Sequence, residues 1–218
     1  MPSSPNLSVF VATPSTNGNF PIQTLMSLLD TQEACMKYGV KVEFGFVTCT
    51  LVHHARTLLA NVFLDRKTEF DRIFFIDSDM KWSPVDFMKV LTKTRKHSIV
   101  VGIYPRRSDE GGYYVTFTPG TENDPPDDDG LTEIDATGLG FACISREVME
   151  CIAASSPKLK YNHATEPMPS IFRMDDDGTM ARGEDYAFWA DVKEAGYKIM
   201  ADATVKLGHV GTKVYEMR

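Results

Sequence analysis

Long hydrophobic runs are absent from this 218-residue sequence, and its first residues do not form a basic segment followed by an apolar one. We therefore expect no membrane span and no secretory signal, and we predict a soluble, cytoplasmic protein. Positive charge is also scarce, because the formal net charge is −7. With no basic stripe to offset that charge, no nucleic-acid partner is expected. A phosphate ligand is not excluded, since it needs only a local cation.

Closely paired cysteines are missing as well. The four cysteines form no C-x-x-C pair and are scattered over Cys35, Cys49, Cys143 and Cys151. This spacing argues against a zinc site and against a disulfide framework, and it favours reduced core thiols. The composition, 43% hydrophobic and 24% charged, is that of an ordinary globular protein, so we expect one domain over residues 1–218.

What the sequence does contain is a regular alternation of apolar strands and amphipathic helices in its first half. Strands are expected at residues 7–13, 40–48, 72–76 and 98–102, and helices at 21–39, at 53–67 and from Pro84 onward. The first helix is indicated by apolar residues at helical spacing, Ile22, Leu25, Met26 and Leu29. This alternation predicts an α/β fold with a mostly parallel sheet and helices on both faces.

After Tyr104 the rhythm changes to shorter segments. We expect strands at 113–118, 131–136, 141–145 and 197–203, and helices at 146–154 and 183–195. Residues 155–182 are expected to form a long loop and residues 205–218 an irregular tail. Two runs of three aspartates, at 127–129 and 175–177, lack calcium-loop spacing and are expected to be solvated turns.

The strongest chemical signal is Asp77-Ser78-Asp79, which directly follows the apolar run Ile73–Ile76. Ligands of open α/β sheets bind beyond the carboxyl ends of the strands, where both acids would emerge. Two unpaired acids there would repel each other, and a divalent cation that also holds a diphosphate would remove that cost. The alternative is that Asp77 caps the next turn and Asp79 is solvated, which this short motif alone does not exclude.

Three further segments are candidates for the same site. Thr13-Pro14 ends the first strand, where it could meet a nucleotide or simply make a turn. Gly183-Glu184-Asp185 opens a helix, so its carboxylates could take a proton or stabilise a cationic sugar carbon, or merely complement the helix dipole. His209 is flanked by glycines and could offer a neutral imidazole to manganese, or be structural.

Several motifs follow one another along nearly the whole chain: Thr13-Pro14, Ala55-Arg56, Phe75-Ile76-Asp77-Ser78-Asp79-Met80, Gly102-Ile103-Tyr104-Pro105-Arg106, Thr137-Gly138-Leu139-Gly140-Phe141, Gly183-Glu184-Asp185 and His209. Their order resembles that of the GT-A fold nucleotide-sugar glycosyltransferases, and it is most similar to the soluble glycosyltransferase domains encoded by chlorella viruses. A viral source would place the protein in the host cytoplasm. The resemblance implies a Rossmann-like sheet with a smaller antiparallel and loop region on the acceptor side.

The resemblance also implies roles for individual residues. The nucleotide-binding half would span about residues 1–104 and the acceptor-side half about 105–218. Mn²⁺ or Mg²⁺ would be held against the diphosphate by Asp79, His209 and, directly or through water and ribose, Asp77. The nucleoside and phosphates would be bordered by Thr13, Pro14, Arg56 and Ser78, and the sugar and acceptor by Arg106 and the segment from Gly138 to Phe141. Glu184 and Asp185 would face the reacting carbon. Arg56 has a second interpretation, as an arginine on a helix surface.

The implied activity is metal-dependent transfer of a hexose or deoxyhexose from a UDP-sugar to a hydroxyl of a glycan or glycoprotein acceptor. Transfer with inversion of the sugar's anomeric configuration would use Asp185 as the base. The implied metal ligand His209, late in the sequence, favours transfer with retention of that configuration.

Three other functions remain as alternatives. A phosphatase of the haloacid dehalogenase type would want a small hydroxyl residue where Lys81 stands. A nucleotidyltransferase would want a basic, glycine-rich first loop, which residues 15–19 do not provide. A non-catalytic sugar-binding module would not need the intact acids.

Overall fold

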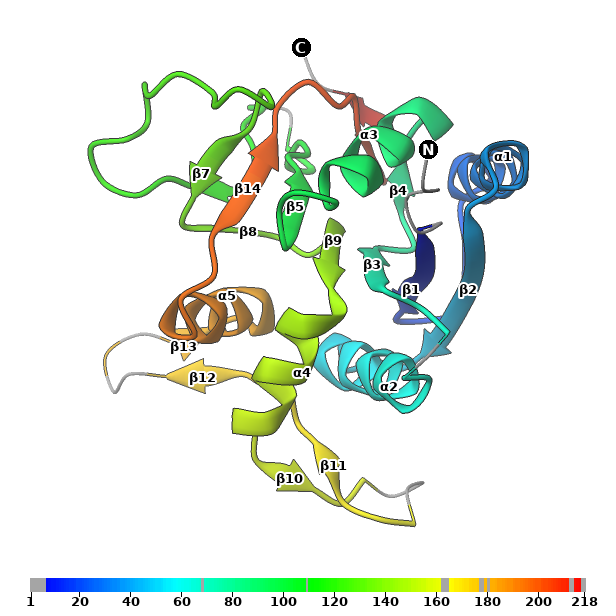
Figure 1. Cartoon of the computed structure of the whole chain (residues 1–218), viewed down its shortest axis with the longest axis vertical. Coiled ribbons are helices and arrows are strands. Elements are labelled where there is room, and N and C mark those ends of the chain that lie inside the picture. The colour runs from blue at the N-terminus through cyan, green and yellow to red at the C-terminus, as the bar shows by residue number, and fades with distance from the viewer. Residues whose placement is uncertain are drawn as a thin grey trace, which may run out of the picture.

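A seven-stranded sheet forms the centre of the molecule (Figure 1). The structure is a computed structural model and describes residues 7–67, 69–108, 110–161, 165–176, 179, 181–211 and 214–216. The sheet has the strand order β2-β1-β3-β9-β5-β14-β7. These strands are β1 (Ser8–Ser15), β2 (Lys41–Thr48), β3 (Arg72–Ile76), β5 (Ile99–Gly102), β7 (Thr132–Ile134), β9 (Phe141–Ser145) and β14 (Ile199–Asp202).

The sheet is mixed but mostly parallel. β1 pairs in parallel with β2 and β3, and β5 pairs in parallel with β14. β9 lies between β3 and β5 and is antiparallel to both, and β7 is antiparallel to β14. Five of the seven strands, β1, β2, β3, β5 and β14, therefore share one direction. The predicted α/β class is confirmed.

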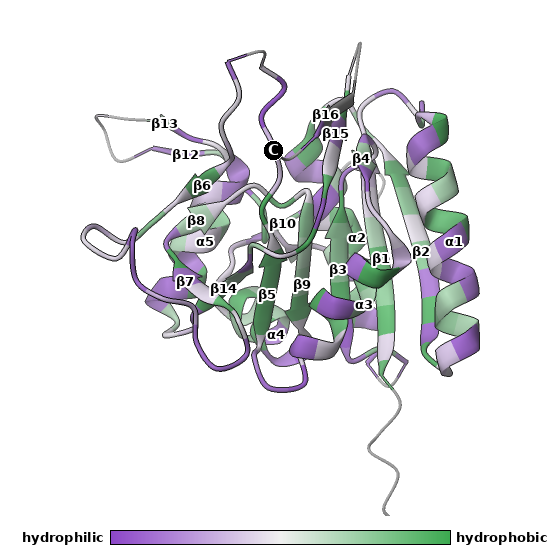
Figure 2. Cartoon of the chain, turned by 90° about the horizontal axis from the view of Figure 1, so that it is seen from above, coloured by the Kyte–Doolittle hydropathy of each residue, from purple (hydrophilic) through white to green (hydrophobic). Residues whose placement is uncertain are grey.

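Two layers of helices cover the sheet. In Figure 1, α1 (Ile22–Tyr38) and α3 (Pro84–Lys93) lie on its upper side, and α2 (Val52–Asp65), α4 (Arg146–Ser155) and α5 (Glu184–Glu194) on its lower side. Successive residues of a strand point to opposite faces, so Ile73 and Phe75 of β3 join the core under α2, α4 and α5, while Phe74 and Ile76 join the core under α1 and α3. This is why the central strands β3, β5 and β9 are predominantly hydrophobic (Figure 2).

α1 presents a polar face to the protein. Thr24 Oγ1 donates to the Met80 carbonyl and Ser27 Oγ to the Trp82 carbonyl, both at 2.8 Å, and Trp82 Nε1 donates to Thr31 Oγ1 at 2.9 Å. These buried hydroxyls hold the segment that directly follows the Asp-x-Asp motif. The apolar stripe that predicted the helix is instead exposed, at Ile22, Leu25, Met26 and Leu29.

The predicted irregular tail contains strands, so that prediction was wrong. β15 (Gly208–Val210) pairs with β4 (Met80–Lys81) and with β16 (Val214–Glu216), and this register sets His209 opposite Met80. Backbone hydrogen bonding to β4 is a long-range constraint that the local sequence does not show.

The remaining strands are short antiparallel pairs: β6 (Val115–Thr116) with β8 (Ala136–Thr137), β10 (Lys158–Leu159) with β11 (Met168–Pro169), and β12 (Asp175–Asp176) with β13 (Ala181–Arg182). Asp175 and Asp176 thus form a strand rather than a turn, and Asp177 lies outside the described residues. Across the described part of the chain, no helix combines the length and apolarity that crossing a membrane requires.

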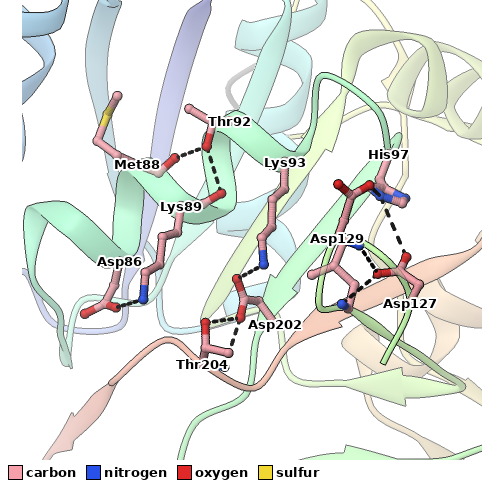
Figure 3. A network of polar contacts seen from close by, with 11 residues as sticks. Asp86, Met88, Lys89, Thr92, Lys93, His97, Asp127, Asp129, Asp202 and Thr204 are labelled. Carbon is pink, nitrogen blue, oxygen red and sulfur yellow. Dashed lines mark hydrogen bonds and ion pairs between the residues drawn. The ribbon is translucent and has the colours of Figure 1, made fainter. Parts of the chain in front are cut away.

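A buried ion pair anchors the chain that leads from β14 to His209. Asp202 ends β14 and is fully buried, and its Oδ2 accepts from Lys93 Nζ of α3 at 2.6 Å (Figure 3). Its Oδ1 accepts from the backbone nitrogen and hydroxyl of Thr204. Burial alone would raise the pKa of Asp202, but the Lys93 ammonium and the Thr204 donors lower it below its ordinary value.

We expect Lys93→Met to lower the free energy of unfolding by about 3–5 kcal/mol, because it leaves a buried carboxylate without its cation. Urea denaturation measures this, with Lys93→Arg as the control that keeps the charge. Because the folded-state pKa of Asp202 is depressed, its contribution is present above the unfolded pKa and is lost as pH falls through the folded pKa. The gap between wild type and Lys93→Met should therefore close on acidification, and equal stability at neutral pH would contradict the expectation.

Candidate active site

A cavity of about 360 Å³ opens at the carboxyl ends of β1, β3 and β5. Four carboxylates line it, Asp77, Asp79, Glu184 and Asp185, together with three basic side chains, Arg56, Arg107 and His209. The strands bring these residues to one edge of the sheet, as expected for ligand sites of open α/β folds. The predicted acids of the Asp-x-Asp and Gly-Glu-Asp motifs thus do meet in one place.

Arg56 is the buried cation of the cavity, with only 4% of its side chain exposed. It lies on the inward face of α2, one helical turn before Leu59 and Ala60, so the interpretation as a surface arginine is wrong. Its Nη2 donates to Asp77 Oδ1 at 2.7 Å, and its Nη1 pairs with Glu184 Oε1. Burial opposes the charge, but the two carboxylates raise the pKa of Arg56 further above its ordinary value.

Asp77 is consequently held toward Arg56. Its carboxylate does not cap the following turn, which is closed by a backbone hydrogen bond from Met80 N to the Asp77 carbonyl at 3.2 Å. Its own backbone N–H donates to the Gly140 carbonyl at 3.1 Å. The two acids of the Asp-x-Asp motif therefore have different partners: Asp77 pairs with Arg56, and Asp79 lies beside Arg107 and His209.

Asp79 and His209 form a pair suited to a metal ion. The β4–β15 pairing brings His209 Nε2 to 3.4 Å from Asp79 Oδ1, and His209 Nδ1 lies 3.2 Å from the Pro105 carbonyl. Burial, and then the Arg107 charge, lower the pKa of His209. Arg107 Nε donates to His209 Nε2 at 3.0 Å, so Nε2 carries the lone pair and Nδ1–H donates to the Pro105 carbonyl. Nε2 lies on the side of the ring that faces Asp79. A backbone acceptor behind the ring is typical of histidines that bind metals.

These residues fit a divalent cation in part. Carboxylate oxygen and imidazole nitrogen suit Mn²⁺. Asp77, the predicted third ligand, is paired with Arg56. The ligand atoms of Asp77, Asp79 and His209 do not all lie within 4.8 Å of one another. Ligands from a nucleotide and water would have to complete the coordination.

Among the described residues, one set of three potential metal ligands does have its ligand atoms within 4.8 Å of one another: His97, Asp127 and Asp129 (Figure 3). His97 directly precedes β5, so this trio lies at the opposite end of the sheet from the cavity. Asp127 Oδ1 accepts the backbone N–H groups of Asp129 and Leu131, and Lys96 pairs with Asp129. The side chains thus build a turn, as predicted for this run.

Tyr104 explains the two glycines of the Thr-Gly-Leu-Gly-Phe motif. A Cβ on Gly138 would lie 1.9 Å from the Tyr104 oxygen, and a Cβ on Gly140 would lie 2.8 Å from it. Tyr104 is buried, and its oxygen accepts from Gly140 N at 3.2 Å. Both positions must be glycine for the ring to sit at the floor of the cavity, with Gly138 beside Asp185.

Asp185 differs from its neighbour Glu184 in that no arginine of the described ranges pairs with its carboxylate. Its Oδ1 accepts the backbone N–H of Tyr186. Burial raises the pKa of Asp185, and the Glu184 charge raises it further, against the effect of Arg56. A carboxylate with a raised pKa is a stronger proton acceptor than an ordinary one.

The other predicted residues are placed as follows. Pro14 and Ser78 line the cavity, and Thr13 is buried next to Pro14 with no partner for its Oγ1 in the residues described. Arg106 is exposed, stacks over the Tyr114 ring and does not line the cavity. Its neighbour Arg107 does line it, and the sequence reasoning missed this residue.

Comparisons with known proteins show the fold. No protein-family model matches the sequence, and no curated protein sequence does. A solved structure, A197 from STIV, is similar over 94% of this chain and 86% of its own, with 23% identity and a TM-score of 0.58. GalNAc-T7, solved with UDP, GalNAc and Mn²⁺, is similar over 97% of this chain and 44% of its own, with 9% identity and a TM-score of 0.58. The chain thus has an α/β fold similar to that of GT-A glycosyltransferases.

A third structure has a weaker likeness. It is a glycosyltransferase involved in the glycosylation of the major capsid of PBCV-1, similar over 66% of this chain and 63% of its own at 10% identity, with a TM-score of 0.39. The specific likeness to glycosyltransferase domains of chlorella viruses therefore stays a prediction.

We expect Gly138→Ala to destabilise the protein by about 1–3 kcal/mol, because the added methyl group displaces the buried Tyr104 ring. Chemical denaturation of a double-mutant cycle checks the cause. Combining Gly138→Ala with Tyr104→Ala should cost less than the sum of the two single changes, and simple additivity would show that the ring is not what the methyl group meets.

Proposed function

We propose that the chain is a metal-dependent glycosyltransferase that moves a hexose or deoxyhexose from a UDP-sugar to a hydroxyl of a glycan or glycoprotein. The observation that carries this proposal is the close approach of the Asp79 carboxylate and His209 Nε2, 3.4 Å apart, beyond the end of the central strand β3. This pair opens into the same cavity as a second group of acids on α5. A cation site next to a free carboxylate is the arrangement that glycosyl transfer from a nucleoside diphosphate needs.

Asp79 and His209 would hold the metal, with Asp77 contributing through water or ribose. A bound metal would neutralise the charge that develops on the departing diphosphate. Pro14 and Ser78 line the adjoining wall and suit the nucleoside and phosphates, with Thr13 behind them. The preference for UDP and Mn²⁺ is supported by GalNAc-T7, a structure of similar fold that was solved with both.

Asp185 is the residue we assign to the acceptor. Glu184 pairs with Arg56, whereas the Asp185 carboxylate pairs with no cation among the described residues and lies next to Gly138 at the cavity wall. In an inverting reaction it would take the proton of the acceptor hydroxyl. In a retaining reaction the leaving phosphate would take that proton, and Asp185 would orient the acceptor.

The phosphatase alternative lacks its hydroxyl group in the structure as well. Lys81, two residues beyond Asp79, is in β4, and its Nζ donates to Glu216 Oε1 of β16 at 2.5 Å.

Thermal melting with UDP and Mn²⁺ tests the proposal. Mn²⁺ and UDP together should raise the melting temperature by several degrees, because a ligand at about 100 times its Kd contributes about 2.7 kcal/mol. Either ligand alone should have a smaller effect. A phosphatase would instead hydrolyse a generic phosphate ester. A melting temperature that no nucleotide changes in the presence of metal would contradict the proposed glycosyl transfer.

We expect Asp79→Ala to abolish both transfer and the joint effect of UDP and Mn²⁺. The melt without ligands should change little, because the Arg107–Asp79 ion pair that is lost is solvent-accessible and the hydrogen bond from Val210 N to the Asp79 carbonyl is kept. Sugar-nucleotide hydrolysis and melting curves measure the two effects. Turnover that survives in this variant would refute the metal site.

A further inference from the structure

Arg107 occupies the space between the two groups best suited to a metal. Its Nη2 pairs with Asp79 Oδ2, and its Nε donates to His209 Nε2 at 3.0 Å. His209 Nδ1 is engaged by the Pro105 carbonyl, so Nε2 is the nitrogen that a cation would use. The guanidinium and a divalent cation therefore compete for the same lone pairs.

Arg107 also differs from Arg56 in its freedom to move. The Arg107 side chain is 44% exposed, whereas Arg56 is 4% exposed with both η nitrogens paired to carboxylates. The loop that carries Arg107 is tied at its base by the Pro105–Tyr113 bridge and by a hydrogen bond from Arg106 N to the Gly112 carbonyl at 2.9 Å. A change of rotamer can therefore move the guanidinium while the loop keeps its hydrogen bonds.

The charges in the cavity indicate where the guanidinium would go. Four carboxylates and two arginines line it, and Arg56 is already committed to Asp77 and Glu184. Once a cation takes Asp79 and His209, Arg107 loses both partners. A diphosphate beside the cation offers oxygens that the planar fork of a guanidinium binds in pairs.

On the premise of the function proposed above, we propose that Arg107 is a donor-binding residue with two positions. Without metal it pairs with Asp79 and His209; with metal bound at those residues it pairs with the donor diphosphate. Metal binding thereby releases a second positive group for the diphosphate. The two ligands are coupled through this side chain, each favouring the binding of the other.

Titration of Mn²⁺ without nucleotide tests the first position, with the electron paramagnetic resonance signal of free Mn²⁺ as the readout. Arg107→Ala should bind Mn²⁺ about five- to tenfold more tightly than wild type, because the competing cation is gone. Arg106→Ala removes the same charge from the same loop and should bind Mn²⁺ as wild type does. Adding Asp79→Ala to Arg107→Ala should abolish the binding, which assigns it to this site.

Calorimetric titration of UDP at saturating Mn²⁺ tests the second position. Arg107→Ala should lower the affinity for UDP about tenfold and leave the affinity for UMP, which lacks the second phosphate, close to that of wild type. Arg107→Lys keeps the charge without the planar fork of the guanidinium, so its affinity for UDP should lie between those of wild type and Arg107→Ala. Undiminished UDP affinity in Arg107→Ala would overturn the phosphate-bound position.

The two proposals fail in different ways. A wild-type protein that binds no UDP in the presence of Mn²⁺ overturns the proposed function and with it the phosphate-bound position of Arg107. A wild-type protein that does bind UDP, combined with an Arg107→Ala variant that gains no affinity for Mn²⁺, overturns the exchange of Arg107 alone. The Arg107 side chain is 44% exposed and lies outside the hydrophobic core, so the variants should keep the wild-type circular dichroism spectrum.

Discussion

The ion pairs of Arg56 with Asp77 and Glu184 are the interaction on which the candidate site depends. They join α2, the end of β3 and the first turn of α5, which are far apart in the sequence, at one cation that is 4% exposed. A buried charge is tolerated only when its partners are in place, so each of the three elements constrains the other two. The Arg56 ion pairs therefore fix the relative positions of the cavity walls without a bound ligand.

This anchoring divides each acidic pair of the site in the same way. In Asp77-Ser78-Asp79 the first acid is bound to Arg56 and the second faces His209. In Glu184-Asp185 the first acid is again bound to Arg56, while the carboxylate of the second accepts the backbone N–H of Tyr186. One arginine is thus shared by the first acid of each pair, and the second acid of each pair, Asp79 or Asp185, is not bound to it. A pair of carboxylates on either segment would otherwise repel each other.

Much of the fold could be predicted from the sequence because its determinants are local. The apolar run before Asp77, the proline at the start of α3 and the glycine after α1 each act within a few residues, and the elements they indicate are present. The direction of β9 could not be predicted in this way, since no local pattern distinguishes a strand that runs against its neighbours. The strands of the C-terminal segment depend on β4, more than a hundred residues earlier.

For the site, the sequence identified the acids and His209, but not how they pair. Helical spacing places Arg56 with Leu59, Ala60 and Phe63, so its inward direction could have been recognised. Arg107 was missed because the motif that carried the resemblance ends at Arg106, and which of two adjacent arginines faces a cavity depends on the loop conformation. In α1 both the small polar and the aliphatic residues recur at helical spacing, and only the hydrogen bonds to Met80 and Trp82 show which face is buried.

The position of β9 has a consequence for how the molecule folds. β3 and β5 do not touch each other in the sheet; each is hydrogen-bonded to β9, which comes later in the chain. During synthesis the first three sheet strands can assemble early, but the edge of β3 stays open, and β5 has no neighbour until residues 141–145 have left the ribosome. Closing the sheet around this late strand requires contacts between distant segments, which slows folding and leaves an aggregation-prone edge exposed in the meantime.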